Sequence, residues 1–297
     1  MIYDCFTFFN ETELLKLRLE LLSNVVDKFI IVEADKTQKG IKKEFNFERI
    51  KPLFDEKYPG KIIYIKVTDC PVLKDSKDWV IEHFQRNAIM GGVYSCKAED
   101  LIMISDIDEI PDPAVLCNMQ KYAVIPINKS SPNKKIHLKQ FFSLLGENKK
   151  FLKSDTLDFF LEYMPVVLEQ KFFYYFMNNL ANEKWYGTIL CRYKNMRIPQ
   201  QLRNRRNIMP YVKNAGWHFS YLGGIERIKE KLNSIIEGDN FCLPATFKTE
   251  EEYISYCLDN GKDIFNREGL SFSIIGESKI GLADIQNIKN TYPTFFR

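Results

Sequence analysis

The 297-residue sequence lacks the marks of several common protein classes. Its seven cysteines are odd in number and form no Cys-x-x-Cys pair, which argues against a disulfide framework and a structural zinc site. No apolar run approaches the roughly 20 residues of a membrane span. The first nine residues have no basic segment and include Asp4, unlike a signal peptide. We therefore expect a cytoplasmic protein with at most peripheral membrane contact.

Neither sign of charge is in large excess. The chain has 42 Lys and Arg against 39 Asp and Glu, and the net charge of +3 is too small to indicate a nucleic-acid partner. What the chain does have is apolar and aromatic residues, 45% and 14% of the total, as is typical of a globular protein. Its length is near the upper limit for a single hydrophobic core.

Alternating strand and helix patterns predict an α/β fold with a mostly parallel sheet and right-handed crossovers. The expected strands are residues 2–9, 28–33, 61–67, 101–104 and 172–177. The expected helices are residues 10–24, 47–58, 77–91 and 225–236. The side chains expected to cap helices are Asn10, Ser76 and Thr249. The polar residues 128–139 are expected to form an exposed loop.

Three acids, Asp106, Asp108 and Glu109, follow the apolar strand at residues 101–104. Carboxylates at the end of a buried strand lie in the crevice where open α/β sheets bind ligands. Asp106 and Asp108 share one face of a regular strand, and a divalent cation would relieve their repulsion. We expect Mn²⁺ or Mg²⁺ there, with Asp108 as first ligand and Asp106 as second, directly or through water. A solvated acidic turn is the alternative. Glu109 points to the opposite face if the strand continues, and for it a site acid and a turn or capping acid are both open.

Histidine occurs at three positions only. His218 lies between Trp217 and Phe219, in a segment expected to form a loop over a bound ligand. It is predicted to be a metal ligand or a contact to that bound molecule, because a neutral imidazole binds Mn²⁺. His83 and His137 are expected to be ordinary hydrogen-bonded residues.

Residues near His218 are candidates for ligand binding and proton transfer. Trp217 is predicted to stack on the bound ligand or to pack in the core, and Tyr221 is a second ligand contact. Glu226 is the predicted catalytic base beside Asp108 and His218, or else an ordinary acid at a helix N-terminus. The rival bases are Asp155, Asp158, Glu162 and Glu183.

Five sequence blocks together resemble glycosyltransferase family 17, which includes the β-1,4-mannosyl-glycoprotein β-1,4-N-acetylglucosaminyltransferases. The blocks occur in the family's order along the chain. They are Tyr3–Glu11, Val26–Ala34, Gln85–Ile89, Ser105–Pro111 and Gly216–Gly224.

This resemblance implies a GT-A fold, in which a Rossmann-like, mostly parallel sheet flanked by helices binds a nucleotide sugar. It implies one compact domain with a donor half at residues 1–127, an acceptor half at 128–240 and a helical extension at 241–297. It also implies a UDP-sugar donor (UDP-GlcNAc in the known animal members), Mn²⁺ or Mg²⁺, and inversion at the anomeric carbon.

We expect no counterpart of the membrane anchor and lumenal stem of the animal enzymes in this protein. A microbial or viral relative, with a glycan or lipid-linked glycan as acceptor, fits that expectation. The resemblance then implies acceptor contacts from Trp217, stacked on a sugar ring, from Tyr221 and from His218 if it is not a metal ligand.

Donor contacts are expected near the ends of the first strands and before the metal strand. Glu33 ends the second strand and would accept from the ribose or uracil, and Phe8 lies where such folds bind the base. Arg86 would pair with a phosphate, with Asp106, or with an acid one turn earlier. Asn87 follows it as a further donor contact. The six cations within residues 192–206 are expected to form a solvated face, or else to contact the diphosphate, an anionic acceptor or a membrane surface.

Three other functions are open alternatives. A phosphohydrolase of the haloacid dehalogenase type has Asp-x-Asp after its first strand, whereas the motif here follows the fourth. A sugar nucleotidyltransferase has a Gly-rich basic loop near the N-terminus, and residues 2–12 contain neither Gly nor Lys or Arg. A non-catalytic sugar-binding module would not need a metal to bind a nucleotide.

Overall fold

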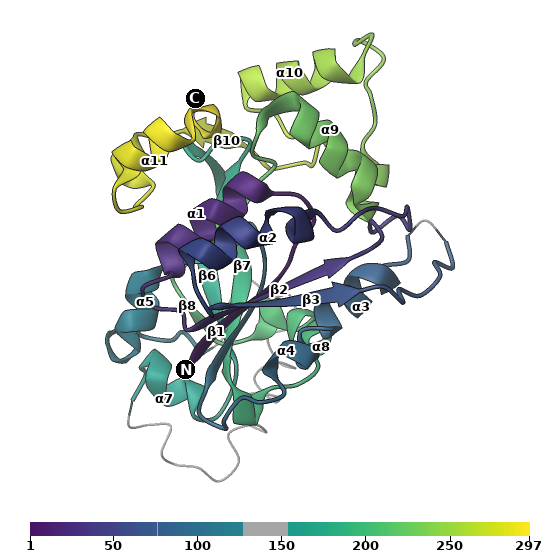
Figure 1. Cartoon of the computed structure of the whole chain (residues 1–297). Coiled ribbons are helices and arrows are strands. Elements are labelled where there is room, and N and C mark those ends of the chain that lie inside the picture. Colours follow the sequence, from purple (N-terminus) through teal and green to yellow (C-terminus); the bar gives the residue numbers. More distant parts are fainter. Residues whose placement is uncertain (76, 127–153) are drawn as a thin grey trace.

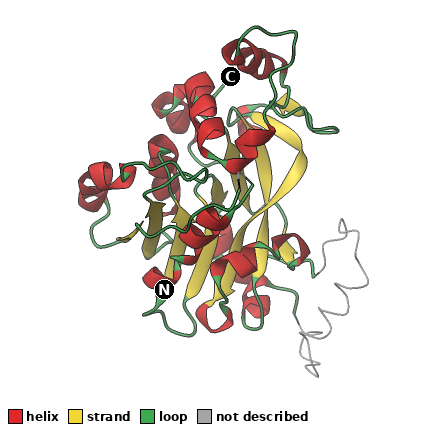
Figure 2. Ribbon diagram, turned by 90° about the vertical axis from the view of Figure 1, so that its right-hand side faces the viewer, coloured by secondary structure: helices red, strands yellow, loops and turns green. Residues whose placement is uncertain are grey.

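The computed structural model describes residues 1–75, 77–126 and 154–297. Figure 1 shows a curled central sheet with helices on both sides, and the turned view of Figure 2 shows the strands crossing the middle of the molecule. Within the described ranges, no helix combines the length and apolar character that crossing a membrane requires. Ser76 and the loop predicted at 128–139 lie outside the described residues, as does His137.

The N-terminal part of the sheet is parallel. Strands β1 (Ile2–Thr7), β2 (Lys28–Ala34), β3 (Ile62–Val67) and β4 (Leu101–Asp106) lie in the order β3-β2-β1-β4. All residues of β2 after Lys28 and all of β4 before Asp106 are buried. Strands covered on both faces read as continuous apolar runs, which explains why the sequence predicts them well.

The C-terminal part of the sheet is mixed. The long strand β7 (Asn179–Arg192) pairs antiparallel with β4 and continues the sheet into the second half of the chain. Strand β6 (Val166–Tyr174) pairs antiparallel with β7 and parallel with β9 (Gly216–Ser220). The short β5 (Glu109–Pro111) follows β4 in sequence but crosses to pair with β9 at the far end.

Helices cover both faces of the parallel part. Helices α1 (Thr12–Leu22) and α2 (Asn46–Lys57) contribute leucines and phenylalanines to the core on one face. Helices α3 (Val80–Asn87), α4 (Met90–Val93) and α8 (Pro199–Arg203) cover the other face. Figure 1 shows these two groups on opposite sides of the strands, so the sheet is enclosed in the manner of a Rossmann-like fold.

The helices that follow β9 pack on the same sheet and form a third hydrophobic cluster with it. Helices α9 (Gly224–Ser234) and α10 (Glu250–Asn260) enclose a cluster of aromatic and aliphatic side chains with Phe172 and Tyr174 of β6. The remaining helices and strands are α5 Pro113–Cys117, α7 Leu157–Leu161, α11 Ile285–Thr291, β8 Tyr211–Val212 and β10 Phe272–Ile274. The 3₁₀ turns are η1 Met119–Lys121, η3 Tyr193–Asn195, η4 Arg206–Ile208, η5 Ile236–Asn240, η6 Glu277–Lys279 and η7 Pro293–Phe295.

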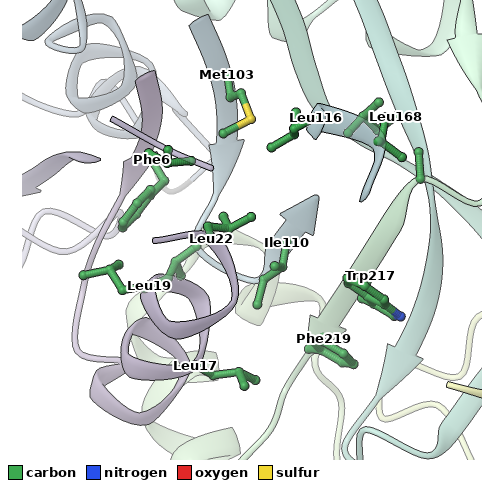
Figure 3. Close-up of a cluster of buried hydrophobic side chains, with 14 of the residues drawn as sticks. Phe6, Leu17, Leu19, Leu22, Met103, Ile110, Leu116, Leu168, Trp217 and Phe219 are labelled. Carbon is green, nitrogen blue, oxygen red and sulfur yellow. The ribbon is translucent and has the colours of Figure 1, made fainter. Parts of the chain in front are cut away.

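The largest core cluster joins both halves of the chain. Figure 3 shows Phe6 of β1 and Leu19 of α1 facing Trp217 and Phe219 of β9 across the interior. Trp217 and Phe219 alternate with His218, so the two aromatic side chains and the imidazole leave β9 on opposite faces. One face of strand β9 therefore packs in the core, and the opposite face carries His218.

The α/β, Rossmann-like fold predicted from the sequence is confirmed, and several local predictions need correction. The helix predicted at residues 77–91 is two helices, α3 and α4. Asn10 does not cap α1, whose cap residue is Glu11. Thr249 does cap α10, with its hydroxyl accepting from the Glu252 N–H at 3.2 Å. The loop predicted around His218 is strand β9, because pairing with distant strands fixes it.

Candidate active site

A cleft of about 380 Å³ opens at the carboxyl ends of the parallel strands. Phe8 follows β1, Lys36 follows β2 and Asp106 ends β4, and all three line this cleft. The opposite wall comes from the C-terminal half of the chain, including His218 and Tyr221. Parallel α/β sheets bind ligands at this edge, and the volume is in the range of small-molecule sites.

Asp106 is held by two arginines from the helical layer beyond the sheet. Arg86 of α3 donates to one carboxylate oxygen at 2.8 Å, and Arg203 of α8 donates to the other at 2.6 Å. Burial alone would raise the pKa of Asp106, but Arg203 and Arg86 together outweigh it and hold that pKa well below its usual range. Asp106 is therefore a fixed anion whose two oxygens both already accept hydrogen bonds.

Asp108 faces the cleft with different neighbours. Its Oδ1 lies 3.6 Å from His218 Nε2, and its Oδ2 accepts from Lys231 Nζ at 3.1 Å. Burial opposes the ionised form, yet Lys231 and then His218 outweigh it and lower the pKa of Asp108. The Lys231 ammonium also lies 4.7 Å from the centre of the Tyr221 ring. Asp108 thus meets a histidine on one oxygen and a lysine on the other.

The His218 imidazole is held by stacking. Its ring packs on that of Phe172, with centroids 5.0 Å apart, and on that of Trp185, with centroids 4.3 Å apart, and these two rings also contact each other at 5.6 Å. Its Nδ1 is buried and has no hydrogen-bond partner within the described part of the chain. Trp185 is itself fixed, because its indole N–H donates to Glu109 at 2.6 Å. The two flat neighbours orient the edge of the imidazole toward Asp108.

Arg18 of α1 holds the turn that carries both aspartates through hydrogen bonds to its backbone. Arg18 is fully buried and pairs with both carboxylate oxygens of Asp4 on β1. Its Nη1 donates to the carbonyl oxygens of Asp106, Ile107 and Glu109 at 3.1, 3.0 and 2.8 Å. Glu109 closes the same turn by accepting from the Asp106 N–H at 2.9 Å, the role expected of a turn acid.

Several residues predicted for the site line the cleft. They are Phe8, Arg86, Asp106, Asp108, His218 and Tyr221. Four other predicted residues do not line it, namely Glu33, Asn87, Trp217 and Glu226. The carboxylate of Glu33 is fully buried and accepts from Lys43, from Tyr64 and from the N–H groups that open α2, so it stabilises that helix. Asn87 accepts from the Gln200 N–H at the start of α8.

For Trp217 and Glu226 the structure agrees with the second of the two predicted alternatives. Trp217 packs in the core and donates to the Ile280 carbonyl at 2.8 Å, which is the core alternative of the two readings. Glu226 is exposed in the first turn of α9 and does not line the cleft. The rivals do not line it either. They are Asp155, Asp158, Glu162 and Glu183. Neither does His83.

The basic segment at residues 192–206 divides into three settings. Arg192 pairs with surface acids, including Asp158 and Glu162, as a solvated face would. Arg203 is buried and holds Asp106 and Glu109. Arg206 lines the cleft with its guanidinium 5.1 Å from the centre of the Trp185 ring. The solvated face predicted for this segment is therefore wrong for Arg203 and Arg206.

The residues present fit a divalent cation at one place. Within the described ranges, no group of three or more His, Cys, Asp and Glu side chains is placed to hold a metal. Asp108 and His218 do converge, and the unpartnered Nδ1 leaves the imidazole free in its tautomer. Magnesium-type sites commonly use one or two protein ligands and complete their shell with water and substrate phosphates. The pair Asp108 and His218 meets that requirement. Asp106, whose two oxygens already accept from Arg86 and Arg203, would support the turn rather than bind the cation directly.

Comparison with known proteins gives one family. Residues 1–139 match the model of glycosyltransferase family 17, a range that includes the parallel strands and the aspartate turn. No curated protein matches the chain. Over residues 1–139 the chain is therefore similar to glycosyltransferase family 17, which supports a glycosyltransferase.

Proposed function

We propose that this glycosyltransferase moves GlcNAc from UDP-GlcNAc to a hydroxyl of a glycan or lipid-linked glycan, with inversion at the anomeric carbon and with Mn²⁺ or Mg²⁺ bound. The observation that carries the proposal is the convergence of Asp108 and His218, 3.6 Å apart, in the cleft at the strand ends. The donor sugar and the inversion come from the resemblance to the family.

The proposed reaction makes one bond and breaks one. The acceptor oxygen bonds to the anomeric carbon, the bond from that carbon to the β-phosphate oxygen breaks, and its electron pair leaves with UDP. The hydroxyl proton passes to a carboxylate base. Asp108 and His218 would hold the cation, which when bound neutralises charge on the leaving diphosphate as a Lewis acid. Arg86, Arg203 and Arg18 keep the turn that carries Asp108 in place.

We assign the base to Glu237 rather than to Glu226. Glu237 lies in η5 and is the one acid that the C-terminal half contributes to the cleft lining within the described residues. Its side chain is 41% exposed, and its ion pair with Arg267 is long, at 3.5 Å. A carboxylate so placed is open to an acceptor and faces the cleft from the side opposite the donor strands.

The test is a donor screen. Release of UDP is measured from a panel of UDP-sugars with Mn²⁺ and with EDTA, because slow hydrolysis identifies a donor even without the acceptor. We expect UDP-GlcNAc to give the highest rate and EDTA to remove it. Equal rates in EDTA would contradict the metal, and a higher rate with another UDP-sugar would contradict the donor. No release from any UDP-sugar would contradict the proposal as a whole.

A further inference from the structure

Four flat groups form one cluster at the wall of the cleft. The Arg206 guanidinium packs on Trp185, Trp185 on His218, and His218 on Phe172. The contacts of His218 with Trp185 and Phe172 have interplanar angles of 26° and 17°, and the Trp185 and Phe172 rings also contact each other, with centroids 5.6 Å apart. The indole N–H donates to Glu109, so the cluster is fixed to the aspartate turn.

Arg206 differs from the other cations of the cleft. Arg86, Arg227, Arg267, Lys43 and Lys231 each pair with an acid within 4 Å, and Lys36 donates to a backbone carbonyl. Within the part of the chain that the structure describes, Arg206 has neither an acidic partner within that distance nor a side-chain hydrogen bond. Burial, and then the charge of Arg203, lower the pKa of Arg206 to about 10. A partly buried guanidinium without a counterion is incomplete without an anion.

We propose that Arg206 binds the diphosphate of the nucleotide donor, with its planar donor fork presented to the cleft by the face of Trp185. This deepens the proposed function and rests on it. An arginine on an aromatic face keeps its five N–H groups free, and the guanidinium fork matches the geometry of phosphate oxygens. Its partner Trp185 also holds His218, so the diphosphate contact and the histidine share one support.

The proposed contact between Arg206 and the diphosphate would persist from donor binding to the release of UDP. The donor diphosphate carries its charge into the cleft, and cleavage of the anomeric C–O bond adds the electron pair to the β-phosphate oxygen. A fixed cation that needs no movement stabilises that growing charge. Arg206 therefore contributes to the recognition of the β-phosphate, which distinguishes UDP from UMP.

The test compares UDP and UMP binding by titration calorimetry in Mn²⁺. We expect the wild-type protein to prefer UDP at least 10-fold. Arg206→Gln should weaken UDP binding about 10- to 100-fold and lower the UDP-to-UMP ratio by the same factor, as the loss of a charge-assisted contact does, while the share of the preference that Mn²⁺ supplies remains. Arg206→Lys should recover part of the preference, because it keeps the charge without the fork. Arg205→Gln, the same change at the exposed neighbour, should bind as the wild type does.

The outcomes separate this inference from the proposed function. A wild-type UDP-to-UMP ratio in Arg206→Gln would overturn the role of Arg206 while a UDP-sugar donor still stood. An effect on the KM for the acceptor alone would overturn it too, in favour of an anionic acceptor. If the wild-type protein binds neither nucleotide, the donor proposal fails and the role of Arg206 fails with it. Thermal unfolding of each variant shows that the binding data refer to folded protein.

Discussion

At the scale of single residues, the chemistry of the cleft depends on which partner each carboxylate has. Both oxygens of Asp106 accept from arginines that are almost fully buried. Asp108 instead pairs with Lys231, whose side chain is 26% exposed and long enough to move. A cation approaching Asp108 competes with a flexible ammonium, which costs less than displacing a buried guanidinium. The two aspartates of the turn are therefore suited to different tasks, support for Asp106 and ligand binding for Asp108.

Replacing Asp108 with Asn should test this division. We expect transfer to fall about 100-fold or more, because the change removes a charged ligand with almost no change in volume. The heat of Mn²⁺-dependent UDP binding should be lost as well, while the circular dichroism spectrum stays the same. Asp69→Asn, at an exposed position, is the matched control. Unaltered turnover in Asp108→Asn would remove Asp108 from the site.

The assignment of the base predicts a contrast between two glutamates. Glu237→Gln should lower kcat about 100- to 10,000-fold with little effect on UDP binding, because only proton transfer from the acceptor is lost. Glu226→Gln should keep wild-type turnover, since Glu226 is exposed outside the cleft. Initial rates and calorimetry on both variants provide the measurement. The reverse pattern of rates would restore Glu226 as the base.

At the scale of elements, the turn between β4 and β5 is held from two layers. Helix α1 reaches it from one side through Arg18, and α3 and α8 reach it from the other through Arg86 and Arg203. Chains of buried, satisfied polar groups restrict a turn to one geometry. The position of the two aspartates thus depends on the packing of three helices.

Arg18→Met should show how much this support contributes. The change keeps apolar volume but leaves the Asp4 carboxylate buried without its partner, so we expect a loss of about 3–5 kcal/mol in the free energy of unfolding. Arg49→Met, at an exposed position on α2, should change it by less than about 0.5 kcal/mol. Urea titration followed by circular dichroism measures both. A loss below about 1 kcal/mol in Arg18→Met would show that the buried pair contributes little.

The sequence predicts an element well when neighbouring residues determine it, and poorly when pairing with distant residues does. The strands β1 to β4 and the cap at Thr249 follow from neighbouring residues, and the structure confirms them. Strand β9 is five residues long and exists through its pairing with β5 and β6, more than 40 residues away in sequence, so local patterns suggested a loop. Likewise, no local signal distinguishes buried Arg203 from exposed Arg205.

At the scale of the whole molecule, one continuous sheet runs through both halves of the chain. Strand β7 joins the parallel strands to β6, and β6 contributes Leu168, Val167 and Phe172 to three different core clusters. The division at residues 127 and 240 stays a prediction. An unbroken sheet with shared cores nevertheless favours a single cooperative unit.

Cysteine labelling across a urea titration tests that cooperativity. Burial raises the pKa of Cys191 in β7 to about 12 and that of Cys257 in α10 to about 11, so at pH 8 neither folded thiol reacts, whereas an unfolded thiol does. We expect both to become reactive at the same urea concentration. The exposed Cys117 and Cys242 should react without urea. A lower midpoint for Cys257 alone would show that the C-terminal segment unfolds separately.

The alternation within β9 also limits how the protein can be redesigned. Trp217 and Phe219 face the interior while His218 faces the cleft, and the pairing of β9 with β5 and β6 fixes this assignment. A deletion that shifted β9 by one position would turn the imidazole inward and an aromatic ring outward. Loop grafting beside β9 should therefore change the length of the segment before Gly216 only in ways that keep His218 on the cleft face of the strand.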